Sequence, residues 1–214
     1  MVKSVSAARN ESFRDRLLET AEMLLIRRGV EKFAMRQLGA ALGVSTMTAY
    51  HYFKSKDEIL AAVCASNFDR MATLVERRFD PSEDAADNAR AAAKLYRDFA
   101  LEHPVMYRLM FDLAPTDQTL HPDLLRANTR LNNALLQFFY RLLEEGLIAG
   151  DPNIAANAMW ATMHGLVILK MAGKLAPDLD MDHVWDETYT ALTIGFRHRH
   201  NDVESRDREM KQCG

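Results

Sequence analysis

The sequence predicts an all-α fold of about nine helices, and three observations lead to that prediction. Apolar residues recur three and four positions apart along most of the chain, which is the spacing of one face of a helix. Runs of β-branched residues and strict alternation of apolar and polar residues, which would indicate strands, do not stand out. Apolar residues make up 48% and charged residues 27% of the 214 residues, as is typical of a globular protein with a sizeable core.

Start and stop signals place the helices along the chain. Gly29 follows the first helix, where a glycine commonly ends one, and Gly43 turns the chain after the second. Ser45 can cap the third helix, and Ser55 with Glu58 has capping-box spacing at the start of a long fourth helix. The predicted helices cover residues 12–28, 35–42, 46–53, 55–79, 85–103, 105–113, 123–145, 152–172 and 181–198.

Polar and proline-containing segments separate these helices. The clearest break in the first half is Asp80-Pro81-Ser82, and a second is the loop 114–122, which contains two prolines. The end of the chain, residues 200–214, is polar, and we expect it to be disordered.

The composition argues against several classes of protein. Cys64 and Cys213 are too few for a disulfide framework and stand in no C-x-x-C pair, so no metal site is expected. Because no phosphate-binding glycine loop, dinucleotide fingerprint or nucleophile elbow occurs, we expect no cofactor and no enzymatic activity. The first fifteen residues lack the apolar run of a signal peptide, and Lys170 and Lys174 interrupt the longest apolar stretch. A cytoplasmic protein without a membrane-spanning segment is therefore expected.

Charge is distributed unevenly along the chain. Residues 1–60 hold 10 Lys and Arg against 7 Asp and Glu, whereas residues 61–214 hold 17 against 23. The basic first quarter of a chain whose net charge is −3 points to an anionic partner for that part.

The strongest functional pattern lies in residues 35–53, where Leu42-Gly43-Val44 joins two short predicted helices. That is the length pattern of a helix-turn-helix, whose second helix enters the major groove of DNA. Hydroxyl, aromatic and basic side chains follow the turn, and such groups suit contacts to phosphates and base edges. Ordinary packing of two short helices in a bundle is the alternative that periodicity leaves open.

A resemblance to the TetR/AcrR family of bacterial transcriptional regulators lies in residues 29–63, which read GVEKFAMRQLGAALGVSTMTAYHYFKSKDEILAAV. With the first helix, the resemblance covers about 50 residues of the chain. In three places the chain departs from the family's pattern, at Ala34 for a capping Thr or Ser, Gly39 for Ala, and Ala49 for a large apolar residue. The matching positions are Gly29, Arg36, Leu38, Gly43, Val44, Ser45, Tyr50, Phe53, Lys56 and Leu60.

The resemblance implies roles for the residues around the turn. Tyr50 and Lys56 look like phosphate contacts, and Tyr52 takes the place of a histidine with that role. Val44 and Phe53 look like core residues. The candidate DNA-binding residues are Arg36, Ser45, Thr46, Met47, Thr48, Tyr50, His51, Tyr52, Lys54 and Lys56.

The last two predicted helices indicate self-association. Nearly every residue of 154–169 is apolar, so that helix must be covered on two sides. The final helix carries a stripe of large residues beside a stripe of small ones, and we expect a homodimer through these two helices. A monomer with a thicker core is the alternative. The large stripe is Trp185, Tyr189, Leu192 and Phe196, and the small stripe is Val184, Thr188, Ala191 and Gly195.

A second resemblance is to the family's C-terminal domain named for its Trp-His-Gly residues. It rests on residues 95–101, on His103-Pro104 with Tyr107, and on Trp160 with His164-Gly165. It implies dimerisation and a small-molecule pocket between helices. Methionines suit adaptable pockets, although core filling is the alternative for each candidate. The candidate ligand-binding residues are Tyr96, Met106, Tyr107, Met110, Phe111, Phe138, Met159, Trp160, Met163 and His164.

The chain is thus expected to have a helix-turn-helix domain over residues 1–56, a ligand-binding and dimerisation domain over 57–199, and a tail over 200–214. The favoured hypothesis is a homodimeric regulator, a repressor, that a small and mostly apolar ligand releases from a palindromic operator in double-stranded DNA. One alternative is a helical interaction protein that keeps the fold without specific DNA binding. Another is a small helical enzyme, which the missing motifs disfavour.

Overall fold

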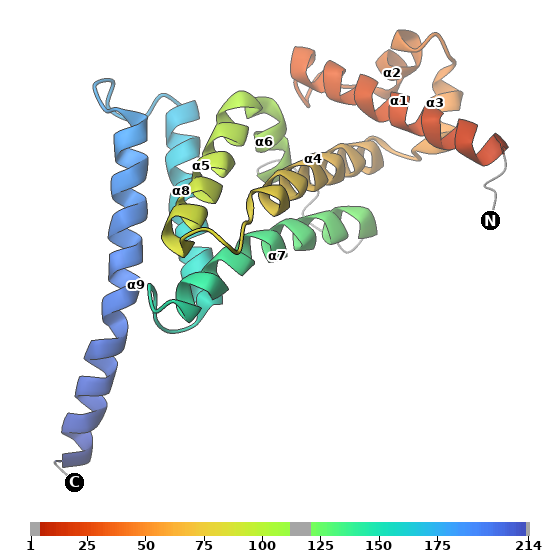
Figure 1. Ribbon diagram of the computed structural model, residues 1–214. Coiled ribbons are helices and arrows are strands. Elements are labelled where there is room, and N and C mark those ends of the chain that lie inside the picture. Colours follow the sequence, from red (N-terminus) through yellow and green to blue (C-terminus); the bar gives the residue numbers. More distant parts are fainter. Residues whose placement is uncertain (1–4, 112–120, 213–214) are drawn as a thin grey trace. The chain divides into compact units, whose positions relative to one another are not determined.

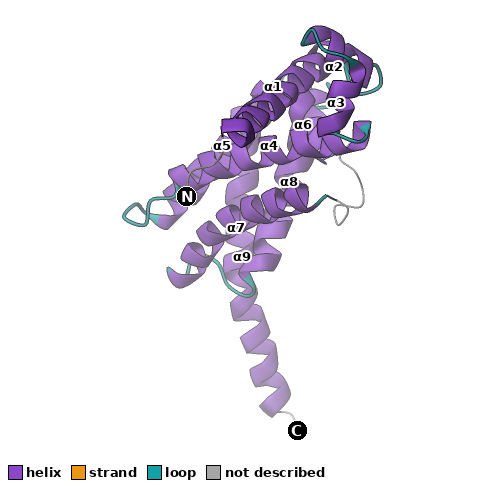
Figure 2. Cartoon of the chain, turned by 90° about the vertical axis from the view of Figure 1, so that its right-hand side faces the viewer, coloured by secondary structure: helices purple, strands orange, loops and turns teal. Residues whose placement is uncertain are grey.

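The computed structural model describes residues 5–111 and 121–212, and the side chains within 12–111 and 121–197. Within these residues the chain forms nine helices and no strand, so the predicted all-α fold is confirmed (Figures 1 and 2). The helices are α1 (Val5–Arg28), α2 (Met35–Ala41), α3 (Thr46–Tyr52), α4 (Lys56–Arg78), α5 (Ala85–Glu102), α6 (Pro104–Phe111), α7 (Pro122–Glu144), α8 (Pro152–Met171) and α9 (Met181–Gln212).

The predicted bounds differ from the observed ones by two residues or fewer for α2 to α8. α1 begins earlier than predicted, at Val5, and α9 continues to Gln212 instead of ending near residue 198. The expectation of a disordered segment after residue 200 is therefore corrected for 200–212, which are helical. In that segment acidic residues precede basic ones by four positions, and this spacing favours a helix. The predicted loop 114–122 lies mostly outside the described residues.

The chain divides into two compact units, each containing two stretches of sequence. The first is Met1–Arg70 with His103–Arg130, and the second is Met71–Glu102 with Leu131–Gly214. Helices α4 and α7 contribute residues to both units. The expected boundary after residue 56 separates the DNA-binding helices from the rest of the chain. This boundary stays a prediction.

The first unit packs α1 against α2 and α6, and α2 against α3 (Figure 1). Leu17 and Leu25 of α1 are fully buried. One face of α4 is buried along the whole length of the helix, with the spacing of three and four that the sequence shows for most of the chain. Its buried members are Leu60, Cys64, Phe68, Met71 and Val75.

The second unit packs α8 against α5 and α9. One face of α8 is buried, and its residues follow one another at intervals of four: Ala155, Met159, Met163 and Val167. The large stripe predicted for α9 is buried at Trp185, Tyr189 and Phe196, while Leu192 is half-buried. None of the helices in the described part of the chain combines the length and apolarity that crossing a bilayer requires.

Candidate nucleic-acid interface and ligand region

The turn between α2 and α3 is held by backbone hydrogen bonds. Gly43 has a positive φ of 68°, a conformation that glycine adopts without strain. The N–H of Val44 then donates to the carbonyl of Gly39 at 2.9 Å, which brings the end of the turn back to the middle of α2. Val44 itself is half-buried, so its predicted place in the core is corrected: it lies at the rim of the unit.

Ser45 caps α3 as its sequence position predicts. Its Oγ accepts a hydrogen bond from the N–H of Thr48 at 3.1 Å, and the two hydroxyl oxygens lie 2.9 Å apart. The cap satisfies one of the free N–H groups at the start of a seven-residue helix. The start of α3 is therefore fixed in direction by a local contact.

The two faces of α3 differ sharply in exposure. Ala49 and Phe53 are fully buried and anchor the helix in the first unit. On the other side, Met47 is 75% exposed and Tyr50 is 41% exposed, and the neighbouring His51 is also exposed. A small alanine at position 49 fits a close approach of α3 to the core. The exposed face carries a thioether, a phenol and an imidazole, and these groups do not pack in the core of the unit.

Tyr52 makes a contact that the sequence reasoning did not foresee. Its ring lies 5.1 Å from the ring of Phe13 in α1 and 5.5 Å from that of His51. The residue is half-buried, so its ring packs α3 onto α1.

The start of α4 holds two of the predicted phosphate contacts. Lys56 Nζ donates to the carbonyl of Val30 at 2.7 Å, which ties the turn after α1 to α4 and leaves two ammonium hydrogens for another partner. Ser55 Oγ accepts from the N–H of Glu58 at 3.0 Å, as the capping-box spacing predicts. The Glu58 carboxylate accepts from the N–H of Lys54 at 2.6 Å, one residue earlier than in the usual box. The side chain of Lys54 is exposed.

The departure at Ala34 has a visible consequence. Ala34 occupies the N-cap of α2 and provides no side-chain hydrogen bond. The side chain of Gln37 reaches back instead, and its Oε1 accepts from the N–H of Ala34 at 3.3 Å. Arg36, the second residue of the same helix, is exposed.

Four of the ligand candidates belong to the first unit, and the structure places them in α6. Met106, Tyr107 and Met110 are buried. Phe111 is half-buried, with its ring 5.4 Å from that of Phe68 and 4.8 Å from that of Tyr107. These contacts are those of a packed core.

The other six candidates belong to the second unit. Tyr96 of α5 and Trp160 of α8 are joined by a hydrogen bond in which Trp160 Nε1 donates to the Tyr96 hydroxyl at 3.0 Å. The ring of His164 lies 5.7 Å from that of Trp160, which is 41% exposed. These three residues, Tyr96, Trp160 and His164, form what we call the aromatic cluster. Phe138, Met159 and Met163 are buried, and Phe138 packs on Phe79 at 5.1 Å between ring centroids.

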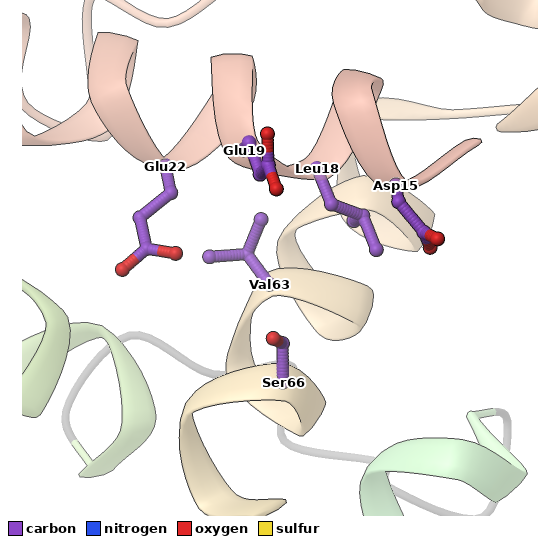
Figure 3. Close-up of a pocket in the computed structure, with 6 residues that line it drawn as sticks. All are labelled: Asp15, Leu18, Glu19, Glu22, Val63 and Ser66. Atoms are coloured by element: carbon purple, nitrogen blue, oxygen red, sulfur yellow. The ribbon is translucent and has the colours of Figure 1, made fainter. Parts of the chain in front are cut away.

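A cleft that the sequence reasoning missed lies between α1 and α4 (Figure 3). It has a volume of about 280 Å³, and Asp15, Glu19 and Glu22 line it from α1. Glu22 is paired with Arg70 at 2.7 Å. In the sequence, the only indication of this cleft is that its three acidic residues are spaced four and three positions apart, which places them on one face of α1. Among the described residues there is no group of three or more His, Cys, Asp or Glu side chains arranged to hold a metal.

The structure also contains two groups of paired arginines and carboxylates that the sequence patterns do not predict. In the first unit, Asp69 of α4 accepts from Arg126 at 2.7 Å and from Arg130 at 3.0 Å, both of α7. The hydrogen bond from Arg126 lowers the pKa of the Asp69 carboxyl, and Arg130 adds to this effect. In the second unit, the nearly buried Arg97 of α5 pairs with Asp182 of α9.

These features define a class of protein. A capped and outward-facing second helix, set by a short turn against the first, is the arrangement of a helix-turn-helix DNA-binding protein, here with a second helical unit. The sequence profile described as "Bacterial regulatory proteins, tetR family" matches residues 17–63. The profile described as "Tetracyclin repressor-like, C-terminal domain" matches residues 89–192. The chain belongs to the tetR family of bacterial regulatory proteins and is a DNA-binding transcriptional regulator, as the resemblance in residues 29–63 implies.

Individual relatives agree with this assignment. An HTH-type transcriptional regulator of Mycobacterium tuberculosis is 27% identical over 198 residues, which cover 92% of this chain and 87% of the relative. The solved structure of a Rhodococcus protein of unknown function is 27% identical with a TM-score of 0.75, covering 86% of this chain and 95% of that one. The structure of RolR with resorcinol bound is 21% identical to this chain, with a TM-score of 0.63. The match covers 89% of this chain and 90% of RolR. At that identity the likeness to RolR concerns the fold.

Proposed function

We propose that the protein is a homodimeric repressor that reads a palindromic operator with α3 of each subunit and leaves it when a small, mostly apolar ligand binds. The observation that carries this proposal is the outward face of α3, where Met47, Tyr50 and His51 are exposed on a helix that is capped and anchored from behind. Polar and apolar groups on such a face can contact base edges in a major groove.

The proposed DNA contacts divide into two kinds. Thr46, Met47, Thr48 and His51 face the groove, and Arg36 of α2 supports them from the adjacent exposed surface. Tyr50, Tyr52, Lys54 and Lys56, with the backbone at Ser45, contact phosphates, because hydroxyl and ammonium donors suit anionic oxygens. The backbone at Ser45 and the side chain of Lys56 also stand at the start of a helix, which favours an anion. Phosphate contacts supply affinity for any sequence, and the groove contacts supply the choice of sequence.

The apolar surface of the second unit supports the dimer. Ile154 of α8 is 58% exposed and Ile194 of α9 is 51% exposed, although both belong to helices with a well-buried opposite face. Ala191 and Gly195 of the small stripe are also exposed, and small residues allow two helices to approach closely. A second copy of the chain, packing α8 and α9 against their equivalents, would bury these residues.

The aromatic cluster supports a ligand site in the second unit. The fold is shared with RolR, whose structure contains resorcinol, a small aromatic diol. The half-exposed ring of Trp160 with His164 beside it offers a ring face and a polar edge to a ligand of that chemistry. The methionines of α6 and α8 fill the cores of their units, and a ligand would reach them by displacing that packing.

Ligand can release DNA only to the extent that it binds a second conformation better than the DNA-binding one. The proposed second conformation places the two α3 helices at a spacing that no longer fits two successive major grooves. Such a regulator acts by binding, so we propose that it has no catalytic activity and needs no cofactor, and that it works in the cytoplasm with bacterial DNA.

Selection of duplexes from a random pool by the purified chain tests the proposal. We expect enrichment of a two-fold palindrome whose half-sites lie about 34–36 Å apart, one helical turn, or a multiple of it. Enrichment of single half-sites without symmetry would contradict the dimeric arrangement. If a folded dimer enriches nothing, the operator hypothesis fails, and the chain is better explained as a helical interaction protein.

A further inference from the structure

Asn67 of α4 is a polar residue with no exposed surface. Its Nδ2 donates to the carbonyl of Val63, one turn earlier in the same helix, at 3.0 Å. Its Oδ1 is buried and has no hydrogen-bond partner among the residues that the structure describes. A buried acceptor without a partner disfavours the state that buries it, by roughly fivefold to 150-fold in an equilibrium constant. Such a group calls for an explanation.

The position of Asn67 along α4 places it where three helices meet. Val63 and Ser66 line the cleft between α4 and α1 (Figure 3). On another side of α4, Cys64 Sγ lies 3.6 Å from the carbonyl oxygen of Leu109 in α6. Asn67 follows Val63 by four positions and Cys64 by three, so its place on the helix lies between these two sides. Because α1 and α6 also pack against each other, the amide is buried at the junction of α1, α4 and α6.

The fold makes little use of the Asn67 side chain. The Val63 carbonyl accepts the N–H of residue 67 in the regular pattern of α4, so the side-chain bond adds no link to another helix. Asn88 of α5 is also buried with an unpartnered Oδ1, but its Nδ2 donates to the carbonyl of Asp80 and ties α5 to the turn after α4. The amide of Asn88 therefore joins two elements of the fold, whereas the amide of Asn67 joins none.

We propose that Asn67 is a conformational switch residue: its unpartnered oxygen disfavours the described packing of α1, α4 and α6 and so keeps a second arrangement of these helices populated. A ligand acts on a protein whose minor conformation is typically about 0.1–10% populated, and a penalty of roughly fivefold to 150-fold raises a rarer conformation into that range. The inference rests on the proposed release from DNA for its use in regulation. A change at the junction reaches the recognition helix because α1 packs against α2 and α2 against α3.

Asn67→Leu tests the proposal, because leucine has the same branching and the same number of heavy side-chain atoms without a polar atom. We expect a melting temperature about 2–4 °C higher. We also expect amide hydrogen exchange about tenfold slower over residues 17–25 of α1 and 106–110 of α6, and a smaller effect over residues 155–167 of α8 in the second unit. Asn88→Leu is the matched control. It removes a buried asparagine with the same unpartnered oxygen from the second unit and should not slow exchange in α1 or α6.

The other outcomes contradict the switch. Equal slowing in both units would show that Asn67 lowers the stability of the folded state without favouring a second arrangement. Faster exchange in α1 and α6 with a lower melting temperature would show that the amide supports the packing, and unchanged exchange would show that it has no effect. Asn67→Val offers a smaller apolar side chain in case leucine prevents folding, and failure of both variants to fold also overturns the proposal. The comparison uses neither DNA nor ligand, so it decides the switch even where duplex selection rejects the proposed operator binding.

Discussion

Lys56 shows how one residue can serve both the fold and the DNA. Its ammonium donates to the Val30 carbonyl at 2.7 Å, which holds the turn between α1 and α2 against the start of α4. Two hydrogens remain for a phosphate. The structural and the DNA-binding roles can be separated by salt dependence, because only a phosphate contact releases counterions.

We predict that Lys56→Ala weakens binding to all duplexes and lowers the slope of log affinity against log salt by roughly 0.9 per subunit. Lys174→Ala, an exposed lysine in the loop after α8, is the matched control and should leave the slope unchanged. Titrations at several salt concentrations measure both variants. A weaker affinity with an unchanged slope in Lys56→Ala would assign this lysine to the fold alone.

The side chain of Ser45, which caps α3, is a second single residue whose contribution can be measured. Replacing Ser45 by Ala removes the acceptor for the Thr48 N–H, and we predict a loss of about 1 kcal/mol in the free energy of unfolding of the first unit. Ser66→Ala, at an exposed position in the middle of α4, removes a hydroxyl without removing a cap and should cause no such loss. Chemical denaturation monitored by circular dichroism compares the two variants. Equal stabilities would mean that the cap does not stabilise α3.

At the scale of the helices, α4 and α7 are tied together in the first unit by Asp69 with Arg126 and Arg130. The arginines lower the pKa of the Asp69 carboxyl, so its charged form is the one that the folded state favours. A carboxyl whose pKa is lower when folded stabilises the protein above its unfolded pKa, about 3.9, and this contribution disappears as the pH falls through the folded pKa.

Asp69→Asn should therefore be less stable than the wild type at pH 7, and the difference should vanish at acid pH. Asp178→Asn, at an exposed loop aspartate, is the control and should behave like the wild type at both ends of the range. Urea unfolding midpoints between pH 7 and about pH 2.5 give the comparison. A difference between wild type and Asp69→Asn that grows on acidification would contradict the assigned sign.

The sequence predicted most helices because each carries its own signals. Gly29 and Gly43 indicated where helices end, and Ser45 and Ser55 indicated where helices begin. The part of α9 beyond residue 198 was not predicted, because the signal for a helix there is the spacing of opposite charges, which is weaker than apolar periodicity.

The candidate site was predicted less completely than the fold. The exposure of Met47, Tyr50 and His51 follows from the helical period and the buried Ala49. The hydrogen bond of Lys56 to Val30 and the ring contact of Tyr52 with Phe13 join residues 26 and 39 positions apart, which periodicity cannot reveal. Ligand candidates were chosen by residue type, and methionine is common in pockets and cores alike.

At the scale of the whole molecule, the central question is how two chains associate. The small stripe of α9 is exposed at Ala191 and Gly195, and an added side chain at Gly195 meets nothing within the chain. We predict that Gly195→Glu leaves the subunit folded and weakens the dimer, because the new carboxylate would be buried against its own copy. Arg197→Glu places the same residue on the opposite side of α9 and should leave the dimer intact. Sedimentation equilibrium distinguishes the variants, and a Gly195→Glu dimer as tight as the wild type would exclude this stripe from the interface.

The most direct test of the account is the ratio of affinities for the selected and a scrambled duplex at about 0.15 M salt, measured for the wild type and for Met47→Ala/Thr48→Ala/His51→Ala. We expect a wild-type ratio of roughly 10³ or more and a ratio near one for the variant. The variant should remain folded, because Met47 and His51 are exposed and the Ser45 Oγ still has the Thr48 N–H as its donor. A variant that keeps the wild-type ratio would show that α3 does not read the operator.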